Sequence, residues 1–583
     1  MHILRTLRQR LRGPLLSGHI SACGKTALHL SVNGKLFYEG ETKMRAKKIL
    51  AILLATMMLL ALLAACGGGS DTPATDTPAN DPATNAPAAD GPAADAPSAD
   101  GPKTVTYGTT DSFGNGFNPL SSVEGNSHVG RLMYDYLIEL DPVTCTHRSR
   151  ICDEYYWEDD GVTYFFKLKE GVTFSNGAAL TGEDVISSLR IMQTAGNSHS
   201  ANYSVILTDK CYVDEDGLGV HLVFETPYGP ADSLLMSLPI LDKDFCEAHP
   251  DGDEEWWNNP VGSGPYVLKE YQVDSYITAV KRSDYWGEDA YEADEITIRK
   301  YSDGNTMFID FQNGVIDVAL SLDADQVAQL EADPSMGTVH TQSASDVPIV
   351  CLNETREIMQ DAAVREAICY GVDWAAVADI AWGALNMPAT SHYGVNYSCY
   401  TKHDGYAYDK DRAAKALEDA GYKAGDISLK FLVMGQVTQQ RVAEAAQGYL
   451  ADVGINVSVE SYDQSTVLGM YMQGDTDMSI FSLTGMGATL EPWNSLAVYS
   501  GTGPFPCMTV SDPDYNELLN KGLVTSDSAE RDEIYKEVDN WLYDNYWCVP
   551  ICERLEAYCY NSSIASLDLP SVQGVALFGV HFA

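Results

Sequence analysis

The clearest alternation of hydrophobic and polar positions lies between residues 427 and 459. Every odd-numbered position from Ile427 to Val433 is hydrophobic, as is every odd-numbered position from Ile455 to Val459. This period of two is typical of strands. Hydrophobic residues between the two runs recur at helical spacing; they are Val442, Ala445, Ala446, Tyr449 and Leu450. The pattern predicts a β-α-β unit, with two parallel strands and a helix packed over them.

The same alternation of element types continues beyond this unit. A helical pattern over residues 467–473 leads to a third hydrophobic run over 477–483, which we predict to be a strand. A loop over 484–493 follows. Because ligands in open α/β sheets bind outside the carboxyl ends of strands, this loop is a predicted pocket wall.

Shorter signals occur in the first half of the chain. Residues 105–110 alternate as a strand, and a Gly/Asn-rich loop over 111–116 follows. Residues 159–161 form an Asp-Asp-Gly turn that leads into a strand over 163–169. Thr181, with Asp184 three residues later, predicts the capped start of a helix.

An export signal precedes all of these elements. Residues 49–65 carry no charge and follow a short cationic segment over 44–48, as in a secretory signal. Small residues directly before Cys66 resemble the bacterial lipoprotein motif, so we predict that Cys66 carries lipid after cleavage. The alternative is an uncleaved anchor, since the segment reaches the lower length limit of a membrane-spanning helix. Residues 1–43 precede the signal and are interpreted as an over-called start.

The segment after Cys66 favours the lipoprotein interpretation. Residues 71–102 consist of Ala, Pro, Asp, Thr, Asn, Gly and Ser, without any Leu, Ile, Val or aromatic residue. Such a segment cannot bury enough apolar surface to offset its ordering entropy. We predict a disordered tether over 66–103 that holds a folded body at a membrane.

Composition limits the function of that body. The chain carries 37 Lys+Arg against 82 Asp+Glu, a formal net charge of −45. This acidity excludes nucleic-acid binding through phosphate neutralisation. About 480 residues follow the tether, which is enough for two or three domains. Of the 13 cysteines, none forms a CxxC pair, and only Cys548 and Cys552 are close enough in sequence to suggest one bridge.

Motifs for catalysis or metal binding fail on inspection. Residues 214–225 match part of a calcium loop, but Leu218 occupies a ligand position and the flanks alternate as strands, so we predict a hairpin turn there. The glycines of Gly262-Ser-Gly264 are too close for a nucleophile elbow. The chain contains no P-loop and no HExxH. We therefore predict a binding protein that is not an enzyme and has no cofactor or metal.

Several short segments occur in an order that is characteristic of one family. They are residues 117–120 (FNPL), 157–189, 262–266 (GSGPY), 283–286 (SDYW), 313–317 (NGVID), 364–373, 411–422 and 453–457 (VGINV). In this respect the chain, from about residue 105 to its end, resembles the extracytoplasmic solute-binding proteins of the oligopeptide, dipeptide and nickel class, family 5. Members of that family deliver ligand to ATP-driven importers.

The resemblance implies an architecture. The expected fold is α/β and two-lobed, of the periplasmic-binding-protein type II class, with mixed sheets flanked by helices and a hinge between the lobes. Lobe 1 would comprise 104–323 and 553–583, with a sub-lobe over about 142–230, and lobe 2 would comprise 324–552. A ligand in the interlobe cleft would stabilise the closed form. We expect a monomer on the outer face of the cytoplasmic membrane that delivers its ligand to permease subunits.

The resemblance also implies two ligand-binding segments. The first is Thr109, Thr110, Asp111 and Ser112 at the end of the first strand. The second includes Ala488, Glu491 and Trp493. Peptide-binding members place an aspartate four residues before a proline to hold the ligand's α-ammonium, whereas this chain has Ala488 four residues before Pro492.

This departure leaves the ligand open, because a buried ammonium without a counter-charge is unfavourable. Either Glu491 or Asp111 replaces the missing carboxylate, or the ligand is not a simple peptide. An importer receptor for an oligopeptide-like solute is the first hypothesis. A sensor or adhesion lipoprotein with the same fold, or a secreted hydrolase, are the alternatives.

Overall fold

The computed structural model describes residues 101–110, 126–141, 144–194, 200, 202–250, 253–287, 291–320, 322–482, 489–501, 503, 505–568 and 579–583. The predicted signal, the lipidation site Cys66 and the ligand candidates Asp111, Ser112 and Ala488 lie outside these residues. Within the described ranges, no helix combines the length and the apolar character that crossing a bilayer requires.

An eight-stranded mixed sheet organises the first part of the chain. Its order is β12-β19-β11-β1-β10-β9-β8, and β14 also pairs with β19. The strands are β1 (Thr104–Thr109), β8 (Tyr266–Gln272), β9 (Tyr276–Lys281), β10 (Glu295–Lys300), β11 (Val318–Ala319), β12 (Thr338–Ser343), β14 (Asn386–Met387) and β19 (Glu553–Tyr560). The predicted strand over 105–110 is therefore confirmed as β1.

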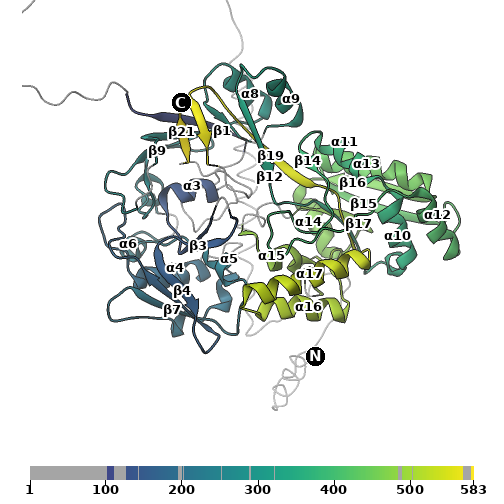
Figure 1. Ribbon diagram of the computed structural model, residues 1–583, viewed down its shortest axis with the longest axis horizontal. Helices are drawn as coiled ribbons and strands as arrows, with labels where there is room; N and C mark the ends of the chain where they lie inside the picture. Colours follow the sequence, from purple (N-terminus) through teal and green to yellow (C-terminus); the bar gives the residue numbers. More distant parts are fainter. Residues whose placement is uncertain are drawn as a thin grey trace, which may run out of the picture. The chain divides into compact units, whose positions relative to one another are not determined.

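Short helices and the end of the chain accompany this sheet. α8 and α9 lie beside it, against β1, β11 and β12 (Figure 1). The helices are α3 (Asn126–Met133), α7 (Glu255–Asn258), α8 (Gly304–Gln312) and α9 (Ala324–Ala332). A hairpin of β20 (Ile564–Leu567) and β21 (Val580–Phe582) ends the chain, and Phe582 lies under the Lys103 ammonium just before β1.

A four-stranded antiparallel sheet, in the order β4-β5-β7-β6, occupies the predicted sub-lobe. Its strands are β4 (Cys152–Trp157), β5 (Thr163–Leu168), β6 (Tyr212–Val213) and β7 (Gly219–Val223). The hairpin turns predicted at 159–161 and 214–219 are both confirmed, and Gly161 has the positive φ of 69° that such a turn favours. β2 (Ile138–Leu140) and β3 (His147–Ser149) add a small antiparallel pair of strands.

Helices accompany this small sheet, and the longest, which packs on β6 and β7, begins where the sequence predicts it. They are α4 (Gly182–Thr194), η2 (Asn202–Val205), η3 (Thr208–Lys210), α5 (Ala231–Leu235) and α6 (Lys243–Ala248). At the start of α4, the Asp184 carboxylate accepts hydrogen bonds from the Thr181 backbone N–H and hydroxyl, at 2.8 and 2.9 Å. The side chain of Asp184 thus supplies the reciprocal half of a capping box.

A second mixed sheet has the order β16-β15-β17-β13-β18. Its strands are β13 (Ile349–Leu352), β15 (Ile427–Met434), β16 (Ile455–Tyr462), β17 (Met478–Phe481) and β18 (Cys548–Pro550). β15 runs parallel to both β16 and β17. α13 (Val437–Asp452) connects β15 to β16 and buries Val442, Ala446 and Leu450. The predicted β-α-β unit and the third strand are confirmed.

The remaining helices belong to the same region as the second sheet. They are η4 (Glu357–Gln360), α10 (Ala362–Gly371), α11 (Trp374–Trp382), α12 (Lys410–Asp419), α14 (Gln464–Gln473), α15 (Pro492–Leu496), η6 (Ala497–Tyr499), α16 (Pro513–Val524) and α17 (Ser528–Asp544). α16 and α17 pack side by side (Figure 1). The second sheet and its helices share one hydrophobic core, separate from the core of the first part.

Strand pairing bears on where the lobes divide. α9 packs on β12, and β12 pairs with β19 over its whole length, from Thr338 to Ser343. The first sheet therefore continues past residue 323, where sequence analysis placed the boundary. We propose that the chain crosses between the two sheets within 344–348 and returns within 551–552.

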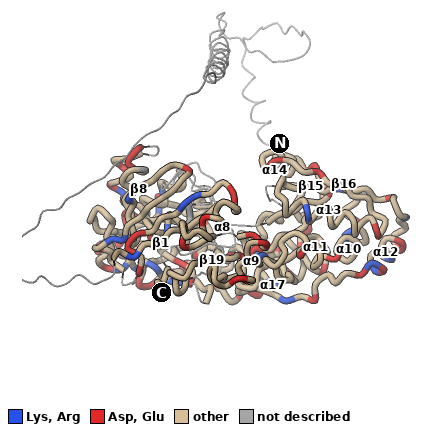
Figure 2. The backbone as a smooth tube through the Cα atoms, turned by 90° about the horizontal axis from the view of Figure 1, so that it is seen from above, with Lys and Arg blue, Asp and Glu red and all other residues tan. Residues whose placement is uncertain are grey.

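Charged residues are spread over the fold. Asp and Glu positions are distributed over helices and loops, with Lys and Arg between them (Figure 2), which is consistent with a role of the acidity in solubility.

The eleven cysteines of the described residues are free thiols. The suggested Cys548–Cys552 bridge is not formed, because β18 runs extended from Cys548 to Pro550 and carries the chain away from Cys548 before it reaches Cys552. Cys548 instead faces Cys351 on the neighbouring strand.

Candidate ligand-binding site

The first predicted binding segment begins at the carboxyl end of β1. This strand lies between β11 and β10 and runs parallel to both. The Thr109 carbonyl accepts a hydrogen bond of 2.8 Å from the Tyr301 N–H, and Thr109 is buried. Thr110, the next residue, is partly exposed. The carboxyl end of a central parallel strand is the edge at which α/β proteins bind ligands. Thr109 and Thr110 lie at this edge, and their ligand-binding role remains a prediction.

The second predicted segment forms the start of α15. Glu491 is the N-cap of this helix, and its Oε1 accepts a hydrogen bond of 3.0 Å from the Trp493 N–H. Pro492 occupies the first turn, where its missing N–H has no consequence. The residue before the cap, Leu490, is buried and has a φ of 50°. A left-handed leucine is unusual, and such backbone conformations cluster at functional sites.

The Glu491 carboxylate is almost completely buried, with 1% of its surface exposed. Its Oε2 accepts a hydrogen bond of 3.0 Å from the Arg531 guanidinium and one of 3.4 Å from the Ser233 hydroxyl. Burial raises the pKa of Glu491, and the positive charge of Arg531 opposes this rise. The negative charge of Glu491 is therefore already balanced within the protein.

These contacts extend to a segment that is distant in sequence. The Arg531 guanidinium also donates to the Gly229 carbonyl, and the Gly229 N–H donates to the Leu523 carbonyl at 2.7 Å. The Ser233 hydroxyl lies 3.4 Å from the Thr489 carbonyl. We call Glu491, Arg531, Ser233, Gly229 and Thr489 the Glu491 cluster.

The predicted boundaries place the members of the Glu491 cluster in different lobes. Gly229 and Ser233 fall in the predicted lobe 1, whereas Thr489, Glu491 and Arg531 fall in the predicted lobe 2. By these predicted boundaries, the cluster would be a buried polar contact between the lobes. It includes Glu491 of the second predicted binding segment.

Further polar side chains surround Ser233. The Tyr164 hydroxyl donates to Asp232 at 2.5 Å, and the His147 Nδ1 lies 4.0 Å from the same carboxylate. His147 Nε2 lies 3.5 Å from the Ser233 hydroxyl. Burial lowers the pKa of His147, with Asp232 acting in the opposite direction.

Sequence reasoning identified Glu491 but not Arg531. Arg531 is a charged residue on the apolar face of α17, in line with Ile534, Tyr535 and Val538, which are buried. A cation at such a position requires a buried partner. This break in the helical pattern is the signal that could have identified it. No comparable signal marks Ser233 or Gly229, whose roles arise from long-range packing.

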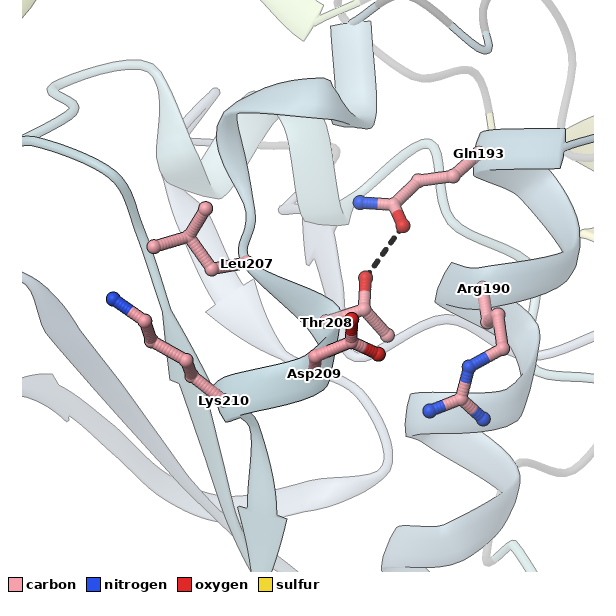
Figure 3. A pocket seen from close by; sticks show the side chains of 6 residues that line it. All are labelled: Arg190, Gln193, Leu207, Thr208, Asp209 and Lys210. Carbon is pink, nitrogen blue, oxygen red and sulfur yellow. Dashed lines mark hydrogen bonds between the residues drawn. The ribbon is translucent and has the colours of Figure 1, made fainter.

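A separate pocket of about 390 Å³ lies between α4 and η3. It is lined by Arg190, Gln193, Leu207, Thr208, Asp209 and Lys210 (Figure 3). The Gln193 amide there accepts from the Thr208 hydroxyl at 2.5 Å and donates to the Tyr203 and Ile206 carbonyls, each at 2.8 Å. The Gln193 amide therefore makes its hydrogen bonds within the protein, and neither α4 nor η3 carries a predicted ligand residue.

Comparison with known proteins places the chain in a family. The profile of the bacterial extracellular solute-binding proteins, family 5 (middle), matches residues 148–506. This match covers more than half of the chain. The protein therefore belongs to the bacterial extracellular solute-binding proteins of family 5.

Individual relatives agree with this assignment. The glutathione-binding protein GsiB of Shigella boydii is 24% identical over 457 residues, which are 76% of this chain and 88% of that protein. The substrate-binding protein CtaP of Listeria monocytogenes has a similar structure, with a TM-score of 0.73 and 21% identity over 82% of this chain and 99% of its own.

A third relative was solved with a ligand. The binding protein DppA of Helicobacter pylori, in complex with the peptide STSA, has a TM-score of 0.67 and 20% identity, covering 82% of this chain and 98% of its own. These similarities confirm the predicted fold class, an α/β, two-lobed binding-protein fold with mixed sheets flanked by helices. The chain is a solute-binding protein.

Proposed function

We propose that this protein is the lipid-anchored substrate-binding protein of an ABC importer, which captures an oligopeptide-like solute between its lobes and delivers it to the permease. The observation that carries the proposal is the family match over residues 148–506. The structural similarity to CtaP and DppA, which extends over nearly the whole length of both proteins, adds to it. The anchor at Cys66 is supported by the sequence around it.

The proposed ligand class is supported by the names of the relatives. GsiB is a glutathione-binding protein, and DppA was solved with a short peptide. Both ligands are small peptides. We therefore assign a short peptide, or a molecule of similar size with peptide groups, to this chain.

Recognition of the peptide's amino end should differ from that in the peptide-binding members described above. Ala488 offers no carboxylate, and Glu491 is occupied by Arg531, the Trp493 N–H and Ser233. Asp111, the other acidic candidate, lies outside the described residues. We propose that the ligand is held mainly through its backbone and side chains, with little dependence on a charged N-terminus.

Acetylating the amino end of a bound peptide should therefore change its affinity by less than about threefold. If a buried protein carboxylate held the ammonium instead, acetylation would break that pair and lower the affinity roughly 30-fold or more, since breaking such a pair costs about 2–5 kcal/mol. Calorimetric titration of matched free and acetylated peptides, with glutathione included in the panel, measures this ratio.

The variant Ala488→Asp is the matched control for this titration. It should create a preference for the free amine, because it restores the missing carboxylate. A 30-fold loss on acetylation in the unaltered protein would overturn the assignment at Ala488. A panel in which no peptide binds the unaltered protein would contradict the proposed ligand class.

A further inference from the structure

Two cysteines that are far apart in sequence face each other in the second sheet. β13 and β18 are antiparallel neighbours, and Cys351 on β13 is the register partner of Cys548 on β18. Both residues are 1% exposed. Burial, together with the neighbouring Cys548 side chain, raises the pKa of the Cys351 thiol, and the described structure records both as free thiols.

The hydrogen bonds on either side define the type of pair that they form. The Leu352 N–H donates to the Trp547 carbonyl at 3.2 Å, and the Ile551 N–H donates to the Pro348 carbonyl at 2.9 Å. Hydrogen-bonded and non-hydrogen-bonded pairs alternate along an antiparallel ladder. Counting inward from both bonds makes Cys351 and Cys548 a non-hydrogen-bonded pair.

This type of pair brings side chains closest together. The Cα atoms of a non-hydrogen-bonded pair lie about 4.5 Å apart, with both side chains on the same face of the sheet. A disulfide requires a Cα separation of about 4.4–6.8 Å. The strand pairing is therefore compatible with a disulfide between the two cysteines without a change in register.

We propose that Cys351 and Cys548 are a redox pair that forms a cross-strand disulfide when the protein folds in an oxidising compartment. The oxidant is a disulfide-bearing compound or thiol–disulfide oxidoreductase. One cysteine thiolate attacks the oxidant's disulfide, forming a mixed disulfide and releasing one oxidant thiol. The second cysteine thiolate then displaces the other. The protein loses two electrons and two protons, and the oxidant leaves as two thiols.

The position of the bond gives it a structural consequence. β13 begins just after the proposed crossing at 344–348, and β18 ends just before the return crossing at 551–552. A Cys351–Cys548 disulfide would therefore close nearly the whole second part of the chain into one loop beside both crossings. Closing a long loop restricts the unfolded chain and stabilises the folded one.

Burial also determines when the bond can form. The thiolate is the attacking species, and burial raises the pKa of the Cys351 thiol. Folded, reduced protein should therefore react slowly with an added oxidant. The bond should form during folding, and in folded protein only as the second core opens.

Peptide mapping tests the proposal directly. The full-length protein, produced by export, is alkylated in denaturant without reduction and digested. A cross-linked peptide containing Cys351 and Cys548 is expected, and reduction before alkylation should remove it. The same bond should form when reduced protein is refolded with oxidised dithiothreitol, which separates this result from any failure of export or ligand binding.

Variants give a second readout. Oxidation should raise the urea midpoint of the unaltered protein and of Cys507→Ala, a control thiol close enough to act on Cys351. It should not raise the midpoint of Cys351→Ala or Cys548→Ala. Alkylation of both cysteines under every oxidising condition, or a cross-link from Cys351 to Cys507, would overturn the proposal. The mapping on the unaltered protein holds even if a variant fails to fold.

Discussion

Replacing Arg531 by alanine should lower the free energy of unfolding by about 3–5 kcal/mol at neutral pH, because it leaves the Glu491 carboxylate buried without its cation. The Glu491 carboxylate is 1% exposed and cannot turn toward water without breaking the cap of α15. Arg531→Ala also removes the donor to the Gly229 carbonyl. Urea unfolding of the variant and the unaltered protein measures the difference.

The pH dependence of this loss has a definite sign. Burial raises the pKa of Glu491 above its ordinary value of 4.5, so its charged form disfavours the folded state increasingly as the pH rises through that range. Without Arg531 that pKa should rise further. The deficit of Arg531→Ala should therefore be smaller in mild acid, where Glu491 takes up a proton.

Two further variants locate the effect. Lys536→Ala, on the same helix, removes an exposed partner of Glu533 and should change stability by less than about 0.5 kcal/mol. Gly229→Ala disturbs the Glu491 cluster from the segment around Gly229. The added Cβ would lie 2.4 Å from the Thr525 carbonyl oxygen and 2.8 Å from Arg531 Cδ, which is too close for either neighbour to stay in place. It should weaken the same contact. A deficit under 1 kcal/mol for Arg531→Ala would contradict this account of the cluster.

Asp539→Asn should have a comparable effect in the second core, about 3–5 kcal/mol. Asp539 lies on α17 and is fully buried. It accepts hydrogen bonds from the Ser391 hydroxyl at 2.8 Å, the His392 N–H at 3.0 Å, His392 Nδ1 at 2.6 Å and His403 Nε2 at 2.9 Å. An asparagine would lose the charge and would direct an NH₂ group toward these donors.

The same variant should alter the response to acid. Burial alone would raise the pKa of Asp539, but the hydrogen bonds from His392 and His403, together with the electrostatic effect of His392, outweigh burial and hold that pKa well below 3.8. A lowered pKa stabilises the folded state above about pH 3.8, and that contribution is lost as the pH falls below it. Asp539→Asn should therefore lose less stability than the unaltered protein on acidification.

Asp532→Asn provides the matched control. Asp532 lies two turns earlier on α17 and accepts an exposed hydrogen bond from Ser398. The test compares the unfolding midpoints of the unaltered protein, Asp539→Asn and Asp532→Asn at pH 7 and pH 3. Equal acid sensitivity of Asp539→Asn and Asp532→Asn would show that Asp539 is not the titrating group.

Local pattern was sufficient to predict much of the fold. β15, α13, β16 and β17 each carry their own periodicity, so the order of residues along the chain determined them. The pairing of β12 with β19 has no such signal, since it joins segments more than 200 residues apart. For the same reason Cys548 was matched with its sequence neighbour Cys552, whereas its partner in space is Cys351.

The candidate site was predictable only in part. Glu491 and Trp493 were identified by their position before and after Pro492, and the structure joins them through a hydrogen bond. The partners that fix the charge of Glu491 come from α17 and from the segment after Gly229, which no local pattern connects. The ligand roles of Thr109, Thr110, Glu491 and Trp493 remain predictions, as do those of Asp111, Ser112 and Ala488 outside the described residues.

The central claim is that this protein captures a small solute for transport. Native mass spectrometry of protein that begins after Cys66, purified without added ligand and then incubated with a peptide pool, tests it most directly. We expect a mass above that of the polypeptide, with a small peptide-like molecule released when the protein is unfolded. The bare polypeptide mass, both as purified and after incubation, would contradict the claim.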